Sequence, residues 1–411
     1  MKKRILSCIA IVAILFFLIV FAVWQNQSRS ENTPPAQPED SCDALVHVGP
    51  SEPTPNNQYD FTYRNKNGTT SDAYLPVGLS NETSFYHQKE LTVHINRSLS
   101  LNENEFCNYG LFEKNSKQFA VFHSEISTQK SAERLCHLLL CYRDYFPILL
   151  FGRFDEKTDA LLSDVCQLSS ASINGITYYC QNLSVTTHES DGTLLLQLQT
   201  PPRTLDLSKE MVALTFDDGP SSHTEQVLSS LVKHRAKATF FVNGTHVTEY
   251  PDAIQAIFAN HCEIGNHTNL HELFEHNTQG IIRKSIEETN KKVRKLIGIG
   301  TFVVRPPGGG TLDRYHKPVT VGYPIIRWSL DTFDYTEHQS ASSVLESIQK
   351  QVRQGDIILM HDTKAITAEA SESIVSYLIS QGFQLVTVSE LLEFSSEGAV
   401  IDRVYNNAFL H

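Results

Sequence analysis

The chain has 411 residues, which is long enough for two folded domains and the segments that connect them. Its formal net charge of -12 argues against nucleic acid or an anionic lipid surface as the main partner. The eight cysteines include no Cys-x-x-Cys pair, which argues against a zinc ribbon, while disulfides between residues 107 and 180 stay an open alternative.

The N-terminal segment predicts a single-pass membrane anchor over residues 1–24. Lys2, Lys3 and Arg4 precede an apolar run from Ile5 to Trp24. Twenty helical residues span about 30 Å, which matches the thickness of a bilayer core. The run ends without a small-x-small cleavage site, which favours a signal anchor over the alternative of a cleaved signal peptide. The basic flank predicts that the rest of the chain lies outside the cell.

Two regions of different composition follow. Residues 25–58 are rich in Asn, Ser, Pro, Glu and Gln, which predicts a flexible linker. Residues 59–200 contain short alternating runs typical of strands and a helical segment at 131–145, which predicts a smaller α+β accessory domain. No group of catalytic residue types stands together there, so we interpret this region as a spacer or a wall-contacting module.

Residues 209–394 alternate continuous apolar strands with helical segments. The expected strands are 211–216, 238–242, 263–266, 302–305, 325–331, 356–361 and 384–388. This alternation predicts an α/β domain with a barrel-like or doubly wound parallel sheet. Residues 395–411 are interpreted as a C-terminal tail.

Polar side chains stand where these apolar strands end. They are Asp217, Asp218, Arg305, Asp331, Asp334 and His361. In parallel α/β folds the C-terminal ends of the strands face one common mouth, so we expect these residues to share one site.

An aspartate pair and a histidine pair indicate metal chemistry. His267 and His271 are four residues apart, so on one face of a helical turn their ring nitrogens could converge on one ion. A carboxylate and two imidazoles leave a coordination position for water, and the other carboxylate of Asp217 and Asp218 is free to act as a base. Alone, each pair is more often a turn or an ordinary histidine. Cys262, close to the histidines, is interpreted as a buried structural thiol.

Five ordered motifs carry a family resemblance. They are residues 215–220 (Thr-Phe-Asp-Asp-Gly-Pro), 267–271 (His-Thr-Asn-Leu-His), 305–309 (Arg-Pro-Pro-Gly-Gly), 331–335 (Asp-Thr-Phe-Asp-Tyr) and 359–362 (Leu-Met-His-Asp). Together they resemble the motifs of the polysaccharide deacetylases, the NodB-homology family or carbohydrate esterase family 4, and most closely its bacterial peptidoglycan N-acetylglucosamine deacetylases. The resemblance covers about residues 210–394 and implies a distorted (β/α) barrel with fewer than eight strands.

The resemblance also implies a metal and a base. Asp218, His267 and His271 would hold a divalent cation, most often Zn²⁺, with Co²⁺, Ni²⁺ or Mn²⁺ as alternatives. Such a cation lowers the pKa of its water towards neutrality, so Asp217, as the general base, removes a less basic proton. Arg305 resembles the residue that pairs with the base and keeps it ionised.

An acid and a substrate pocket complete the implied site. His361 resembles the general acid that protonates the leaving amine, and Asp334 resembles the carboxylate that orients this histidine. A backbone N–H near Gly308 would stabilise the oxyanion, and Leu359 would line the acetyl pocket. Gly308 and Tyr335 stand where many members have Tyr and Trp, and these two departures affect the acetyl pocket and the sugar contacts.

We therefore expect a hydrolase that releases acetate from N-acetylglucosamine in cell-wall peptidoglycan, at the cell membrane with its C-terminal domains extracellular. One alternative is a deacetylase of another extracellular polysaccharide, such as poly-N-acetylglucosamine, chitin oligomers or acetylated xylan. Another is a wall-glycan-binding protein without turnover, against which the intact ionisable motif residues argue.

Overall fold

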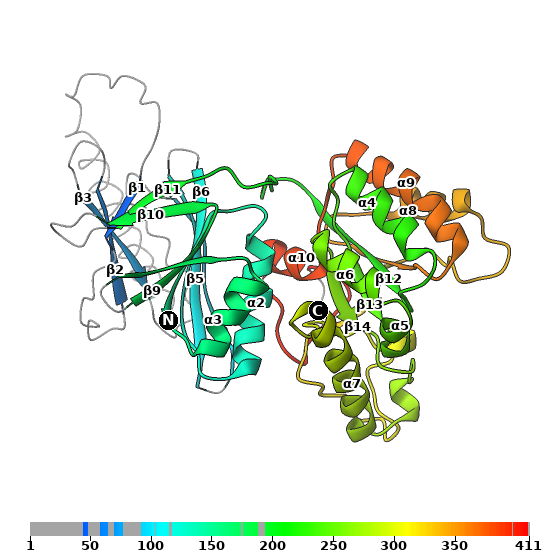
Figure 1. Ribbon diagram of the computed structural model, residues 1–411. Coiled ribbons are helices and arrows are strands. Elements are labelled where there is room, and N and C mark those ends of the chain that lie inside the picture. Colours follow the sequence, from blue (N-terminus) through cyan, green and yellow to red (C-terminus); the bar gives the residue numbers. More distant parts are fainter. Residues whose placement is uncertain are drawn as a thin grey trace, which may run out of the picture. The chain divides into compact units, whose positions relative to one another are not determined.

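Parallel strands alternate with helices in the C-terminal half of the chain, and β-rich sheets form the half before it (Figure 1). The structure is a computed structural model that describes residues 44–47, 58–64, 70–76, 92–102, 104–114, 117–173, 176–187, 194–396 and 398–409. The predicted anchor at 1–24 lies outside these residues. Among the helices within them, none is long and apolar enough to cross a bilayer.

A parallel sheet organises the C-terminal region, with strand order β14-β13-β12-β17-β16. The strands are β12 (Met211–Asp217), β13 (Thr239–Val242), β14 (Glu263–Asn266), β16 (Leu330–Asp331) and β17 (Ile357–His361). Every residue of the central strand β12 is buried, as expected for a parallel strand covered on both faces. The fold is thus of the α/β class.

The predicted strand at 325–331 is wrong as one continuous element. It forms β15 (Ile325–Ile326) and then β16, and the two halves pair with different neighbours. β15 is bridged through Val304 to the β14 end of the sheet, whereas β16 pairs with β17 at the other end. A straight strand cannot pair with both edges, so the chain breaks at 327–329. The break bends the sheet towards a distorted barrel.

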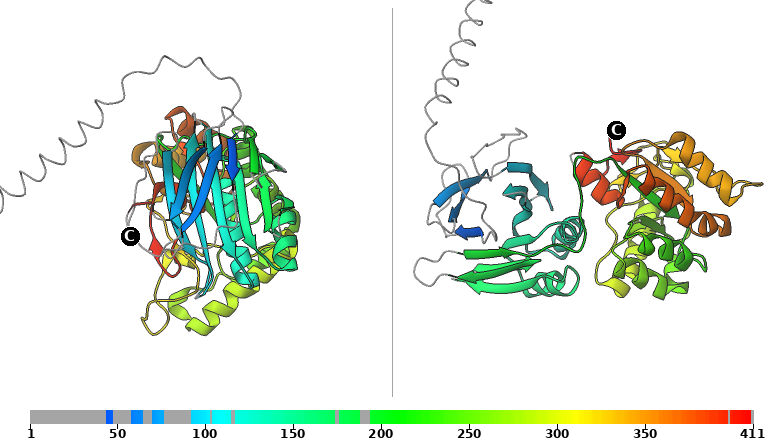
Figure 2. Two further views of the ribbon diagram at one scale, coloured as in Figure 1. Left: turned by 90° about the vertical axis from the view of Figure 1, so that its left-hand side faces the viewer. Right: turned by 90° about the horizontal axis from the view of Figure 1, so that it is seen from above.

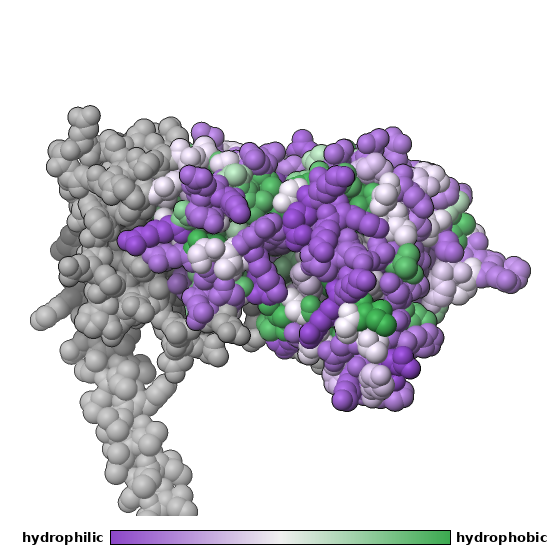
Figure 3. Space-filling model, turned by 60° about the horizontal axis from the view of Figure 1, so that its bottom comes forward, coloured by the Kyte–Doolittle hydropathy of each residue, from purple (hydrophilic) through white to green (hydrophobic). Residues whose placement is uncertain are grey.

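Helices lie outside these strands (Figures 1 and 2). They are α4 (Thr224–Lys233), α5 (Gly244–Glu249), α6 (Pro251–Ala259), α7 (Gln279–Ile297), α8 (Ala341–Gln351), α9 (Ala365–Ser380) and α10 (Val388–Ser395), with short 3₁₀ turns at Phe274–His276 and Pro307–Gly309. The longest, α7, begins after Thr278, whose hydroxyl accepts the Ile281 N–H, and ends at Gly298 with φ 84°. On the face shown in Figure 3, hydrophilic side chains predominate among the described residues and hydrophobic ones form small separate patches.

The end of the chain differs from its prediction in two places. The expected strand 384–388 shortens to β18 (Gln384–Leu385), because Thr387 and Glu390 form a capping box that starts α10. The expected tail 395–411 contains β19 (Val404–Tyr405), which pairs with β15 and buries Tyr405. This segment therefore belongs to the fold.

Two sheets make up the accessory region, which we define as the described residues from 44 to 198. An antiparallel sheet has the order β10-β11-β1-β2-β3. Its strands are β1 (Ala44–His47), β2 (Gln58–Arg64), β3 (Thr70–Pro76), β10 (Leu183–Thr187) and β11 (Leu194–Leu198). β1 lies inside the predicted flexible linker 25–58, so the linker prediction is wrong for residues 44–47. Its short apolar run can join a sheet although the surrounding composition is polar.

The second sheet has the order β4-β5-β6-β7-β9-β8 and carries two helices. Its elements are β4 (Thr92–Ser100), β5 (Phe106–Lys114), β6 (Lys117–Glu125), α2 (Gln129–Tyr142), β7 (Ile148–Arg153), α3 (Glu156–Asp164), β8 (Ser169–Ile173) and β9 (Ile176–Gln181). The helix α2 confirms the helical segment expected near 131–145. The domain boundaries at 59–200 and 209–394 stay predictions.

Cysteine pairing is absent from the part of the chain that the structure describes. The free, buried thiols are Cys107, Cys136, Cys141, Cys166, Cys180 and Cys262. The alternative of disulfides between residues 107 and 180 is therefore wrong, and Cys107, Cys136, Cys141 and Cys166 lie in the apolar core as thiols.

Candidate active site

Two neighbouring aspartates at the end of β12 differ in burial and in backbone conformation. Asp217 is the last residue of the strand and is buried. Asp218 has a left-handed backbone with φ 70°, a conformation that Asp tolerates better than most residues. Its carboxylate contacts both histidines, whereas an oxygen of Asp217 approaches His267 alone. Adjacent residues of the same type can therefore have separate tasks.

The histidine pair lies on a loop after β14, so the expectation of a helical turn is wrong. Thr268 and His271 both have left-handed backbones, with φ 67° and 58°, which a helix does not allow. The loop still brings the rings together. Asp218 Oδ1 lies 3.4 Å from His267 Nε2 and 3.3 Å from His271 Nε2. The three candidate ligand atoms all lie within 4.8 Å of one another.

The protonation of these three groups suits a divalent cation. The backbone carbonyl of Arg305 accepts a hydrogen bond from His267 Nδ1 at 2.8 Å, which leaves the Nε2 lone pair facing Asp218. Burial and the neighbouring His267 lower the pKa of His271, favouring its neutral, ligating form. Burial alone would raise the pKa of Asp218, but His267 and the other histidines outweigh it and the pKa is lowered.

One buried oxygen supports this fit directly. Asp218 Oδ1 is buried and has no hydrogen-bond donor, although it lies between the two imidazoles. A buried carboxylate oxygen without a donor is costly unless a cation pairs with it. The backbone carbonyl of Asp218 is held at 2.7 Å by His246 Nδ1, which fixes the turn. The residues present therefore fit a metal ion with one carboxylate and two imidazole ligands.

A carboxylate next to the histidine loop holds the loop backbone. Glu272 Oε2 accepts the Leu270 N–H at 2.9 Å and the Ser285 hydroxyl at 2.7 Å. The Glu272 N–H in turn donates to Thr268 Oγ1 at 3.0 Å, and the Asn269 N–H donates to Ser285 Oγ at 2.7 Å. Two loop residues are left-handed, so these bonds from α7 and Glu272 hold the loop backbone, in addition to the bond between His267 and the Arg305 carbonyl.

Replacing Glu272 by alanine is expected to weaken metal binding by about 10–100-fold, the usual effect of losing support behind metal ligands. Competition against a chromophoric chelator measures this affinity without any need for turnover. Glu275→Ala is the matched control, because that carboxylate is exposed on the following 3₁₀ turn. Equal affinities in the two variants would show that Glu272 does not support the ligands.

Arg305 holds one oxygen of Asp217 inside the barrel. The guanidinium is 0% exposed, and its Nη1 donates to Asp217 Oδ1 and to Thr215 Oγ1, both at 2.7 Å. The Phe241 ring lies 4.1 Å from its Cζ atom. The other oxygen, Asp217 Oδ2, lies 3.8 Å from His267 Nε2, on the metal side. One oxygen of Asp217 is thus fixed by Arg305, and the other faces the candidate metal ligands.

His361 and Asp334 form a second ionisable pair. His361 ends β17, where it is the register partner of Asp217 on β12. Its Nδ1 donates to Asp334 Oδ1 at 2.8 Å, and its backbone N–H donates to Asp334 Oδ2 at 2.7 Å. Burial lowers the pKa of His361, but the hydrogen bond and charge of Asp334 outweigh burial and raise it. Nε2 is the ring nitrogen left free for proton transfer.

The three residues expected to bind substrate differ in exposure and in their distance from His361. Leu359 is buried on β17, two residues before His361. The Tyr335 ring is 45% exposed, lies 5.3 Å from the His361 ring, and its hydroxyl donates to Asp331 Oδ2 at 3.1 Å. Gly308 has φ 68°, a left-handed backbone conformation in which any side chain would be strained. Its role as an oxyanion donor stays a prediction.

Some supporting residues could not be found from the sequence. His246 and Glu272 contact site residues only because the fold brings them there, and their local patterns carry no signal; Thr215 lies in the first motif, but its contact with Arg305 depends on the fold. Cys262 is buried before the start of β14, and burial raises the pKa of its thiol to about 11. It lies outside the ligand group, which among the described residues is Asp218, His267 and His271. The interpretation as a structural thiol is therefore supported.

Comparisons with known proteins agree with this geometry. A family model described as "Polysaccharide deacetylase" matches residues 204–321. The chain is 34% identical over 195 residues to the peptidoglycan-N-acetylmuramic acid deacetylase PdaC of Bacillus subtilis strain 168, covering 47% of this chain and 41% of that protein. It is 36% identical over 186 residues to the peptidoglycan-N-acetylglucosamine deacetylase PgdA of Listeria monocytogenes, covering 45% and 39%. The chain thus spans about two fifths of the length of these two relatives.

A third relative is matched over nearly its whole length. The peptidoglycan-N-acetylglucosamine deacetylase of Bacillus cereus strain ATCC 14579 is 33% identical over 194 residues, which cover 46% of this chain and 90% of that protein. The match therefore takes in nearly all of that protein. With the five motifs assembled at one end of a parallel sheet, the chain belongs to the polysaccharide deacetylase family.

Proposed function

We propose that this chain is a metal-dependent deacetylase that hydrolyses the N-acetyl group of N-acetylglucosamine residues in peptidoglycan and releases acetate. The observation that carries the proposal is the carboxylate–imidazole–imidazole group placed beside a second carboxylate that an arginine holds. The peptidoglycan deacetylases among its relatives support the choice of substrate. The predicted anchor, with its basic flank, supports a place at the cell membrane with the catalytic region outside.

The chemistry follows from what each side chain can do. Asp218, His267 and His271 would hold the cation, proposed to be Zn²⁺, which when bound supplies a Lewis acid and lowers the pKa of water. Asp217 Oδ2 accepts the proton of the attacking water, while Arg305 holds Oδ1 and keeps the carboxylate ionised.

Bond cleavage needs a proton on the leaving nitrogen. His361 Nε2 donates it, because Asp334 holds Nδ1 and favours the imidazolium. A backbone N–H at Gly308 is the proposed donor to the developing oxyanion. Leu359 and Tyr335, which flank His361, would surround the acetyl methyl group.

Replacing Asp334 by asparagine is expected to move the basic limb of the kcat/KM profile to lower pH. The raised pKa of His361 keeps its acid form populated to higher pH, and removal of the Asp334 charge lowers that pKa. Initial rates between about pH 5 and pH 10 measure the shift. Asp331→Asn is the control, because it removes the charge of a nearby aspartate that bonds to Tyr335 instead of to His361. If the basic limb of Asp334→Asn lies at the same pH as that of the unmodified protein, His361 is not the general acid.

The substrate is tested by acetate release from separate polymers. Peptidoglycan, poly-N-acetylglucosamine, chitin oligomers and acetylated xylan are each incubated with the purified protein, and released acetate is quantified. Release from peptidoglycan supports the proposal, and release from another polymer alone would overturn it. Because one relative is named for N-acetylmuramic acid, that sugar is the second candidate. Mass spectrometry of the digested glycan shows which sugar has lost its acetyl group.

A further inference from the structure

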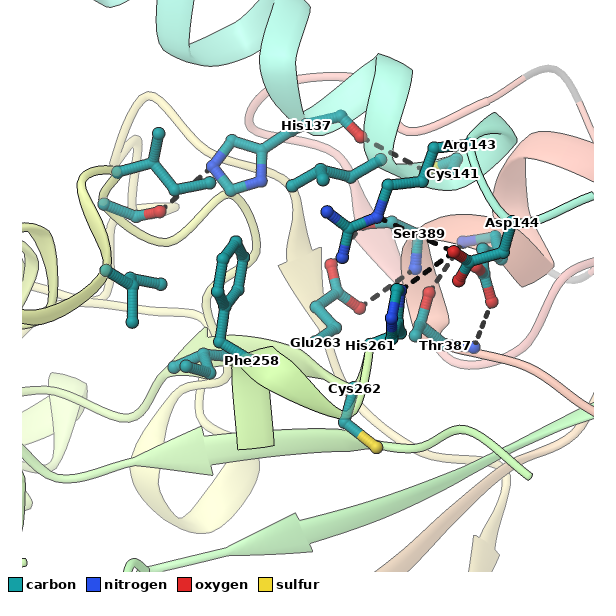
Figure 4. A pocket seen from close by; sticks show the side chains of 16 residues that line it. His137, Cys141, Arg143, Asp144, Phe258, His261, Cys262, Glu263, Thr387 and Ser389 are labelled. Carbon is teal, nitrogen blue, oxygen red and sulfur yellow. Dashed lines mark hydrogen bonds and ion pairs between the residues drawn. The ribbon is translucent and has the colours of Figure 1, made fainter. Parts of the chain in front are cut away.

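A second pocket lies at the opposite end of the barrel from the metal ligands. It is lined by Glu263 and Ile264 at the start of β14, whereas His267 follows the end of that strand. Residues from α2, α6, α7 and α10 and from the segments next to these helices form its other walls (Figure 4). Its volume is about 50 Å³, several times what a single water needs. The proposed hydrolysis gives this pocket no role.

An arginine with few partners extends into this pocket (Figure 4). The Arg143 side chain is 6% exposed. Its Nη1 donates to the Val165 carbonyl at a long 3.4 Å, and its Nε lies 3.7 Å from Asp144 Oδ1 without forming a hydrogen bond. A guanidinium has five N–H donors, and buried ones are ordinarily paired with acceptor oxygens. The Phe258 ring lies 5.7 Å from its Cζ atom and covers one face.

The neighbouring carboxylates are already engaged by other groups. Asp144 pairs with His261 Nδ1 at 2.8 Å and with Lys237 Nζ at 2.5 Å. Glu263 accepts hydrogen bonds from the backbone and hydroxyl of Ser389 and from the Thr239 hydroxyl. Among the described residues that line the pocket, Arg143 is thus held only by one long hydrogen bond and one loose ion pair, which leaves donors of its guanidinium for a ligand.

We propose that Arg143 anchors a short-chain monocarboxylate in this pocket, at a site separate from the catalytic centre. The carboxylate would accept hydrogen bonds from the guanidinium, in the paired geometry that arginine favours. The alkyl group would lie against the apolar wall of Leu140, Ile297 and Ile299. The carboxyl of Glu263 on the facing wall disfavours ligands of higher negative charge, such as phosphate.

The ligand class includes acetate, which is the product of the proposed reaction. Carboxylate binding at Arg143 does not depend on turnover. It can therefore be absent from an active deacetylase, and it can be present in a chain that has no deacetylase activity. If acetate is the natural occupant, it would link the accessory region to the barrel, because Arg143 and Asp144 come from one and Glu263 from the other.

The test titrates the full chain, stripped of metal with a chelator so that no cation is present for acetate in the catalytic site. Isothermal titration and thermal unfolding are followed with sodium acetate, propionate, butyrate and phosphate, and with sodium chloride as the ionic control. We expect saturable binding of acetate or propionate, and no saturable response to chloride or phosphate. Tightest binding of butyrate or propionate would assign the site to a longer acid than the reaction product.

Arg143→Gln is expected to weaken carboxylate binding by roughly tenfold to a hundredfold, the range for losing hydrogen bonds to a charged group. Arg353→Gln, an exposed arginine beyond α8, is the matched control and should bind as the unmodified chain does. Ile297→Phe, which fills the apolar wall and leaves Arg143 in place, gives a second variant if Arg143→Gln does not fold. The proposal is overturned if the unmodified chain responds equally to chloride and acetate, or if folded Arg143→Gln or Ile297→Phe binds acetate normally.

Discussion

Asp217→Asn is expected to lower kcat by about 10²–10⁴-fold while the protein still binds its metal. The asparagine keeps the size of the side chain and its contact with Arg305, but it cannot accept the proton of the attacking water. Its ligating neighbours are unchanged, because Asp218 and not Asp217 lies between the two imidazoles. Steady-state kinetics and metal analysis on the same sample measure both quantities.

Asp218→Asn is the matched variant, and it should give the opposite pattern. It removes the charged ligand, so metal affinity falls and excess metal partly restores turnover. If Asp217→Asn loses metal while Asp218→Asn retains it, the roles of the two aspartates are reversed. A retained kcat in Asp217→Asn at full metal occupancy would exclude Asp217 as the base.

Asp144→Ala is expected to lower the free energy of unfolding by about 3–5 kcal/mol, the usual cost of breaking a buried ion pair from one side. Lys237 belongs to the barrel, and its side chain is 1% exposed. Its ammonium lies between Asp144 of the accessory region and Glu390 of α10. The substitution removes one of its two carboxylates and also leaves His261 without its partner. Chemical denaturation followed by circular dichroism measures the loss.

An exposed aspartate provides the control for this experiment. Asp164 ends α3 at the surface of the accessory region, and Asp164→Ala should change stability by no more than about 0.5 kcal/mol. Similar losses in both variants would mean that the Asp144–Lys237 pair does not hold the two regions together. A large loss confined to Asp144→Ala would make the accessory region an integral part of the folded protein instead of a detachable spacer.

A second contact of the same kind supports this view. Glu393 on α10 is buried and accepts hydrogen bonds from Tyr142 at 2.8 Å and Tyr109 at 3.1 Å, and Arg97 pairs with it at 2.9 Å. Burial raises the pKa of Glu393, although these partners oppose it. Three side chains of the accessory region thus meet one carboxylate of the catalytic region.

The parallel sheet was predictable because its strands are locally distinct. β12 and β17 are continuous apolar runs that end in Asp217 and His361, and both facts are visible in the chain. The location of the site followed, since parallel strands end at one edge. The break between β15 and β16 was not predictable, because it depends on which neighbour each half pairs with.

The candidate site was predictable in its residues and less so in its local structure. A spacing of four between His267 and His271 fits a helix. In the structure a loop brings the two rings together, and two of its residues have left-handed backbones. The contact of Arg305 with Thr215 joins residues 90 positions apart. The ion pair of Arg97 with Glu393 spans 296 positions. Contacts at such separations come from the fold as a whole, and no local pattern of residues marks them.

The central claim is that the Asp218–His267–His271 group carries a metal needed for deacetylation. The most direct test treats the purified protein with a chelator, returns Zn²⁺ in steps, and measures acetate released from peptidoglycan together with bound metal. We predict that acetate release falls to background after chelation and returns in proportion to bound metal, reaching its plateau at one ion per chain. Acetate release that is unchanged by chelation, or full metal binding without any acetate, would contradict the claim.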